Sequence, residues 1–135
     1  MRLLAQFVCD GERLPVPGAR FLQVYQDDPE LDPLPVVVCV PDGARANAEG
    51  IGAAPPRVLP HDVAWEYRED PDEATDDDVD LAQSKAGGTC YFIDVIQPGE
   101  RLLLQLRQFP AQFNFGGYTM VVSIGEDRTI RVALG

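Results

Sequence analysis

The sequence predicts a mainly β protein: a single domain over residues 1–135, built of antiparallel strands in two similar halves that each contain a hairpin, with at most one or two short helices. Three observations support this prediction. A chain of 135 residues has room for one domain. Its twelve glycines and twelve prolines indicate many turns. Its apolar runs are short and rich in β-branched and aromatic residues, which is typical of strands.

The first forty residues contain three predicted strands, bounded by turn-forming residues: Arg2 to Cys9, Ala19 to Gln26 and Leu34 to Val40. The third is a continuous apolar run between prolines. We therefore expect it to be buried on both of its faces.

A loop-rich, acidic insertion is expected from about residue 41 to residue 82. Its first part is dense in proline and glycine, which predicts loop. Further along, Val63 to Tyr67 fits a short strand. Thr75 fits the N-cap of a short helix from Asp76 to about Gln83, whose first turn is acidic.

Four further strands are predicted in the last third of the chain, for a total of seven or eight: Thr89 to Val95, Arg101 to Gln108, Tyr118 to Ile124 and Thr129 to Leu134. The turn residues between the last two predict a terminal hairpin.

The two halves of the chain resemble each other at an offset of 99 residues. Leu3-Leu4-Ala5-Gln6 recurs as Leu102-Leu103-Leu104-Gln105, and Gly18 then falls on Gly117. We interpret this as two similar β-hairpin units that face each other. Each unit is expected to bury one glutamine, bonded to the backbone.

The formal charge of −11 excludes a nucleic-acid binder that neutralises phosphates, and it argues against attraction to an anionic membrane. A partner selected by charge would be basic. The three cysteines form no CxxC pair and are odd in number, which favours a reducing, cytosolic location. The first residues lack the pattern of a signal peptide, and no apolar run approaches the length of a membrane span.

Motifs at both ends of the chain carry a family resemblance. The later set comprises SKAGG (84–88), YF (91–92), LLLQL (102–106) and NFGG (114–117). The earlier set comprises LLAQF (3–7), Gly18, FLQ (21–23) and DD (27–28). In this order they resemble the YwqG-like family, a bacterial β-rich domain of unknown function. The chain departs from the family pattern at four positions: Cys90, Asp94, Arg107 and Gln108.

This resemblance implies a β-rich fold. Because some members of the family are encoded near secreted-toxin systems, it also implies a role in neutralising a toxin. We therefore expect a non-enzymatic, cytoplasmic bacterial protein without cofactor or metal, and most specifically an immunity protein that binds a basic toxin. The alternative is a small-molecule or peptide-binding domain, with a pocket between the two β halves that uses Gln6, Gln105 or Lys85.

The sequence contains no convincing catalytic or metal-binding set. Cys90 and the single histidine, His61, are the weak candidates for a nucleophilic dyad, and a cysteine in an apolar strand is more often a core residue. The alternating Asp76, Asp78 and Asp80 begin like a calcium loop, but the glycine and glutamate that such a loop requires are missing. Lys85, the single lysine, is expected to pair with a carboxylate and fix a turn.

The strongest local feature is an acidic segment from Glu66 to Asp80, which holds nine acidic residues and one basic residue. It is either a solvated loop or a surface that docks a basic partner, with aromatic anchors beside it. The residues that we expect to bind the partner are Trp65, Glu66, Tyr67, Glu69, Asp70, Asp72, Glu73, Asp76, Asp77, Asp78 and Asp80.

Overall fold

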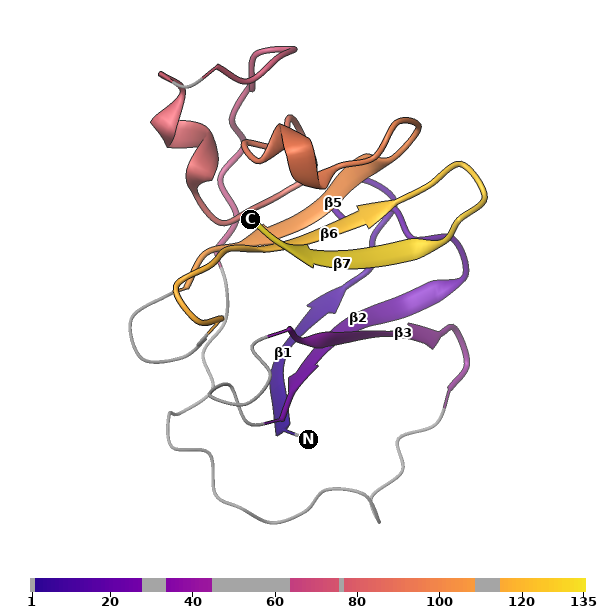
Figure 1. Cartoon of the computed structure of the whole chain (residues 1–135). Coiled ribbons are helices and arrows are strands. Elements are labelled where there is room, and N and C mark those ends of the chain that lie inside the picture. The colour runs from indigo at the N-terminus through magenta and orange to yellow at the C-terminus, as the bar shows by residue number, and fades with distance from the viewer. Residues whose placement is uncertain (1, 28–33, 45–63, 76, 109–114) are drawn as a thin grey trace.

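The structure is a computed structural model that describes residues 2–27, 34–44, 64–75, 77–108 and 115–135 (Figure 1). In this part of the chain seven strands form two antiparallel sheets, so the fold is mainly β, as predicted. A three-stranded sheet has the order β1-β2-β3, with bounds Arg2–Val8, Ala19–Gln26 and Val36–Pro41.

The second sheet has four strands in the order β4-β5-β6-β7, with bounds Lys85–Ala86, Arg101–Leu106, Met120–Ile124 and Ile130–Leu134. Two short 3-10 helices precede β5: η2 at Val79–Ala82 and η3 at Ile93–Val95. The predicted terminal hairpin is present as β6 and β7, closed by a turn in which the Gly125 amide donates to the Thr129 carbonyl.

The main hydrophobic core lies between the two sheets. Phe7, Leu22 and Val24 contribute from the three-stranded sheet. The four-stranded sheet contributes alternate residues such as Met120 and Val122. Side chains at period two along a strand share one face, so these residues form the facing surfaces of a sandwich.

A second, smaller cluster lies on the outer face of the four-stranded sheet. Cys90 packs there on Leu102 and Val121, and Phe92 and other residues of the η3 region pack against them. Both 3-10 helices lie on the side of this sheet that faces away from the three-stranded sheet (Figure 1). A non-regular layer therefore covers the outer face of the four-stranded sheet.

The internal repeat is present in the strand pairing. The β1–β2 ladder has a register shift between Leu3 and Ala5, and the β5–β6 ladder has one between Leu102 and Leu104, which is the same position at the offset of 99. The second strand of each unit follows a different offset. Leu22 pairs with Phe7 while Met120 pairs with Leu106, so β2 matches β6 at an offset of 98 rather than 99.

The prediction that residues 34–40 are buried on both faces is wrong. The strand β3 lies at the edge of the three-stranded sheet, and Val36 and Val38 are 45% and 41% exposed. A run of β-branched residues fits a pleated strand at an edge as well as at the centre, so the apolar sequence did not fix its place in the sheet.

Two other predicted strands are absent. Residues 64–67 form no strand, and residue 63 lies outside the described part of the chain. Residues 89–95 form turns and η3, because Gly87 and Gly88 adopt positive φ values of 68° and 75° and end β4 after two residues. Of the helix predicted from residue 76 to 83, the described residues 77–83 form only the four-residue η2, and residue 76 lies outside the described part of the chain.

Candidate functional site

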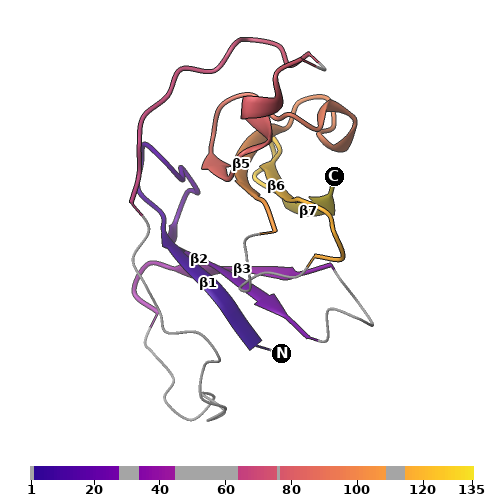
Figure 2. The ribbon, with the colours of Figure 1, turned by 90° about the vertical axis from the view of Figure 1, so that its left-hand side faces the viewer.

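The acidic strap, defined here as residues 64–75, runs along one side of the molecule without regular secondary structure. Figure 2 shows it in magenta, passing from the region of β1 toward the 3-10 helices above the four-stranded sheet. Five of its residues are acidic and one, Arg68, is basic. The strap therefore links the two sheets outside their common core.

One end of the strap is held by Trp65. Its ring meets the ring of Phe7 edge-on, with the centroids 6.3 Å apart. The Arg13 guanidinium lies 6.0 Å from the centroid of the indole ring, within the range of a cation–π contact. The aromatic anchor predicted for a partner is thus engaged with its own fold, although 41% of its surface remains exposed.

The second anchor, near the middle of the strap, is Asp70. Its Oδ2 accepts a hydrogen bond from Lys85 Nζ at 2.6 Å and another from the Thr89 amide at 3.0 Å. The two charged side chains are only 16% and 19% exposed. A Cβ on Gly88 would lie 2.2 Å from Asp70 Oδ2, so the carboxylate can enter only because residue 88 is glycine.

This arrangement confirms the prediction that Lys85 pairs with a carboxylate to fix a turn. Asp70 also differs in role from the other acids of the strap, because the Asp70 carboxylate is bonded to Lys85 and Thr89. Its role as an anchor was missed from the sequence, because the pair joins residues 15 positions apart that no strand pairing brings together.

The remaining predicted partner-binding residues are mostly displayed to solvent. Tyr67 is 91% exposed. Asp78 is half-buried and accepts hydrogen bonds from the Thr75 hydroxyl and amide, which lower the pKa of its carboxyl. The prediction for Asp76 and for the side chain of Asp80 falls outside the described part of the structure. The exposed acids of the set are Glu66, Glu69, Asp72, Glu73 and Asp77.

The two repeat-related glutamines differ. Gln105 is fully buried, and its Nε2 donates to the carbonyls of Leu81 and Gln83 at 2.8 Å each, as predicted. The same prediction is wrong for Gln6, which is exposed and accepts a hydrogen bond from the side chain of Gln23 at 2.7 Å. The two glutamines differ in burial because η2 covers Gln105 on the four-stranded sheet.

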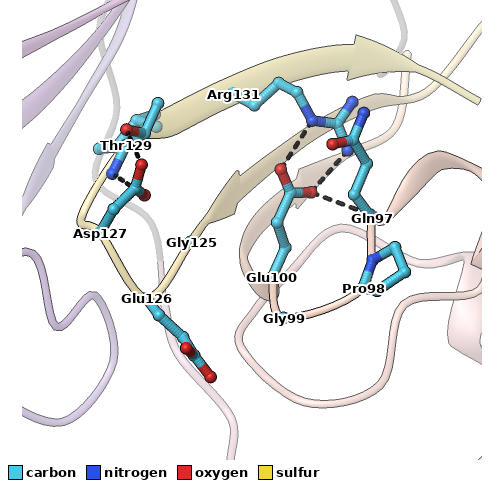
Figure 3. Close-up of a pocket in the computed structure, with 10 residues that line it drawn as sticks. Gln97, Pro98, Gly99, Glu100, Gly125, Glu126, Asp127, Thr129 and Arg131 are labelled. Carbon is cyan, nitrogen blue, oxygen red and sulfur yellow. Dashed lines mark hydrogen bonds and ion pairs between the residues drawn. The ribbon is translucent and has the colours of Figure 1, made fainter.

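A hollow of about 470 Å³ lies at one end of the four-stranded sheet, between the turn before β5 and the β6–β7 turn (Figure 3). Gln6, Lys85 and Gln105, which we expected to supply polar contacts to a ligand, are not among its lining residues. These are Gln97, Pro98, Gly99, Glu100, Gly125, Glu126, Asp127, Thr129, Ile130 and Arg131.

Two charged groups of this hollow, Glu100 and Arg131, are engaged with each other. Glu100 Oε1 and Oε2 accept from Arg131 Nε and Nη2 at 2.8 and 2.6 Å (Figure 3). The Ser123 hydroxyl donates to Oε2 at 2.9 Å. Arg131 also donates to the Val95 carbonyl. The hydrogen bonds from Arg131, with smaller contributions from the Gln97 amide and Ser123, lower the pKa of Glu100 to about 2. We interpret this group as a structural clamp between the turn before β5 and strand β7.

The clamp predicts a pH dependence of stability. A carboxyl whose pKa falls on folding stabilises the protein above its unfolded pKa, and this contribution is lost as the pH drops through the folded pKa. For Glu100 the loss spans about pH 4.5 to about pH 2. We expect Glu100→Gln to be less stable than the wild type at pH 7, with the difference shrinking across this window in urea unfolding. A difference that does not change with pH would contradict the clamp.

The thiols do not resemble activated nucleophiles. Burial raises the pKa of Cys9 to about 11 and also raises the pKa of Cys39 and of Cys90. Both Cys90 hydrogen bonds lead to oxygens of Phe92 and Gln105, and His61 lies outside the described residues. Within the described ranges, no group of three or more His, Cys, Asp or Glu side chains is placed to hold a metal ion.

In the described residues there is no helix of the length and apolar character needed to cross a membrane. Comparison of the chain with protein-family models, with curated proteins and with solved structures gives no match.

Proposed function

We propose that this chain is a non-enzymatic binding protein that captures a basic protein partner through the exposed acids of the acidic strap. In its most specific form, the proposal is a cytoplasmic immunity protein that neutralises a cationic bacterial toxin. The resemblance to the YwqG-like family supports this form of the proposal. The toxin-neutralising role that it implies is a prediction.

The observation that carries the proposal is the anchoring of the strap at two points, Trp65 and Asp70. Trp65 rests on Phe7, and Asp70 is held by Lys85 and Thr89. Between and beyond these anchors, carboxylates and the ring of Tyr67 point to solvent. A segment that is ordered before binding loses less conformational entropy when it docks, which favours affinity.

Concentrated negative charge also favours fast association. A cationic partner is drawn toward the strap over a distance set by the ionic strength, so the association rate falls as salt is added. An exposed tyrosine in the middle of such a surface is the kind of residue that dominates binding energy at interfaces. The strap presents both the concentrated negative charge and the exposed tyrosine without any change in the fold.

The test replaces three exposed strap acids with lysine: Glu66→Lys, Glu69→Lys and Glu73→Lys. A matched control carries the same change of charge at exposed sites elsewhere: Glu12→Lys, Asp94→Lys and Glu126→Lys. Tagged forms are used for capture from the native cell with quantitative mass spectrometry. We expect a cationic protein that the wild type and the control retain and that the strap variant loses by about tenfold or more.

The purified partner then gives two further readouts. Its association with the wild type should slow steeply as salt is added, and with the strap variant this dependence should be weaker. Expression of the partner should inhibit cell growth unless this chain is coexpressed, which tests the toxin-neutralising form. Equal loss of the partner from the control variant would mean that only net charge matters, and the strap would not be the docking surface.

A further inference from the structure

Two anchors bracket a short stretch of the acidic strap. The first anchor is Trp65, which packs on the core, and the second is Asp70, which is bonded to the turn after β4. Only residues 66–69 lie between them, and all four are exposed. We call these four residues the presented segment. Because the fold holds the chain on both sides of it, the segment has few conformations open to it before it meets a partner.

The second anchor contains more than one ion pair. Lys85 Nζ donates to Asp70 Oδ2 at 2.6 Å and to the Thr89 carbonyl at 2.5 Å. The Thr89 amide donates to the same carboxylate, and the Thr89 hydroxyl donates to the Pro71 carbonyl. We call Asp70, Lys85, Gly88 and Thr89 the latch. Its charged groups are mostly shielded from solvent, so added salt weakens the latch far less than it weakens attraction to the exposed acids.

The presented segment combines an aromatic ring with charge. Tyr67 is 91% exposed, and the carboxylates of Glu66 and Glu69 flank it in the sequence. Glu66 pairs with Arg68 at 3.5 Å, but both side chains are largely exposed, so this pair contributes little. A large ring displayed to water gains free energy when it is buried, and carboxylates beside it favour a cationic surrounding. The segment therefore fits a pocket for a phenol ring with a basic rim.

We infer that the partner is a folded basic domain with such a pocket, and that the latch determines the specificity for it; this rests on the proposed function. A folded domain holds its pocket and its cations at fixed positions, so it gains affinity from a segment that is already held in a matching position. A flexible polybasic chain adapts to the acids wherever they lie and gains little from the latch. The latch residues are thus positioning residues, which act through Tyr67 and its neighbours.

The test compares two glycine variants that leave every charge unchanged. Gly88→Ala places a methyl group against Asp70 Oδ2 and opens the latch, whereas Gly87→Ala adds similar backbone strain with open space around its Cβ. Binding kinetics are measured with the cationic protein that the wild type captures and, separately, with poly-lysine. We expect that protein to dissociate about tenfold faster or more from Gly88→Ala, with an association rate within about threefold of the wild type. Poly-lysine should bind the wild type and both variants alike.

Lys85→Met opens the latch from its other side. It removes the cation beneath the strap and makes the chain more negative by one charge, so docking by charge alone would become stronger. We expect instead that the captured protein dissociates about tenfold faster, while poly-lysine binds at least as well as to the wild type. Tyr67→Ala should separate the two ligands in the same way. Thermal unfolding verifies that each variant is folded at the temperature of the measurement.

Distinct results would overturn the latch and the proposed function. Equal dissociation rates from Gly88→Ala and Gly87→Ala would overturn the role of the latch and leave the acidic docking surface in place, as would an equal loss of poly-lysine binding. A captured protein with the circular dichroism of an unfolded chain would overturn the folded partner. If the wild type captures no cationic protein, or if the strap variant with three lysines retains it, the proposed function itself fails.

Discussion

Replacing Gln105 with alanine is expected to lower the free energy of unfolding by about 3 kcal/mol. The side chain is fully buried, and its amide satisfies the carbonyls of Leu81 and Gln83. Alanine leaves both carbonyls without this donor and opens a cavity under η2. Both effects reduce the stability of the folded state, and loss of the carbonyl bonds also frees the layer that covers the four-stranded sheet.

The repeat supplies a matched control for this measurement. Gln6 has the same position in the other unit but is exposed and bonded to the Gln23 side chain. We expect Gln6→Ala to change the free energy of unfolding by about 0.5 kcal/mol or less. Urea unfolding followed by circular dichroism measures both variants. Similar losses at the two positions would show that the η2 cover does not determine the role of Gln105.

Replacing Gly88 with alanine is expected to release the strap from the fold. The added methyl group would lie 2.2 Å from Asp70 Oδ2, and this oxygen cannot move aside while Lys85 and Thr89 hold it. The residue also has a φ of 75°, which alanine adopts at a cost. We expect a loss of about 3 kcal/mol in unfolding free energy together with faster amide exchange in residues 64–75.

A substitution at Gly87 separates the steric clash with Asp70 from the backbone strain of a positive φ. Gly87 has a φ of 68°, but nothing lies within 4 Å of the position that its Cβ would take. Gly87→Ala should therefore show the backbone strain alone, about 1 kcal/mol, with the strap still protected. Hydrogen exchange measured by mass spectrometry reports on the strap directly. Unchanged exchange in Gly88→Ala would mean that the Asp70 contact does not anchor it.

The sequence predicted the strands that belong to local hairpins and failed where tertiary packing decides. Aromatic and β-branched residues between turn-forming residues predicted β2 with its observed bounds, Ala19–Gln26, because both signals lie in the local sequence. Whether a strand lies at the centre or the edge of a sheet depends on its neighbours, which is why the exposure of β3 was not predicted. Cys90 and Phe92 are apolar because they cover a sheet, not because they form one.

The candidate site was also predicted only in part, because some of its features lie in the local sequence and others depend on tertiary contacts. The concentration of acids is a property of the sequence, and the pairing of a single lysine with a carboxylate follows from the cost of burying an unpaired charge. The choice of Asp70 among nine acids depends on the space left by Gly88, which only the structure shows. The Glu100–Arg131 clamp was missed because it joins residues 31 positions apart, one in the turn before β5 and the other in β7.

The order of the strands in each sheet follows the order of the chain, and no strand of one sheet pairs with a strand of the other in the described residues. Each ladder thus closes a connection between sequence neighbours, which keeps the entropic cost of forming it low. Between β3 and β4, the described residues 42–44, 64–75 and 77–84 take part in no ladder. Exposed positions among them can therefore change over evolution without disturbing the hairpins, whereas Asp70, Leu81 and Gln83 are tied to the four-stranded sheet by their hydrogen bonds.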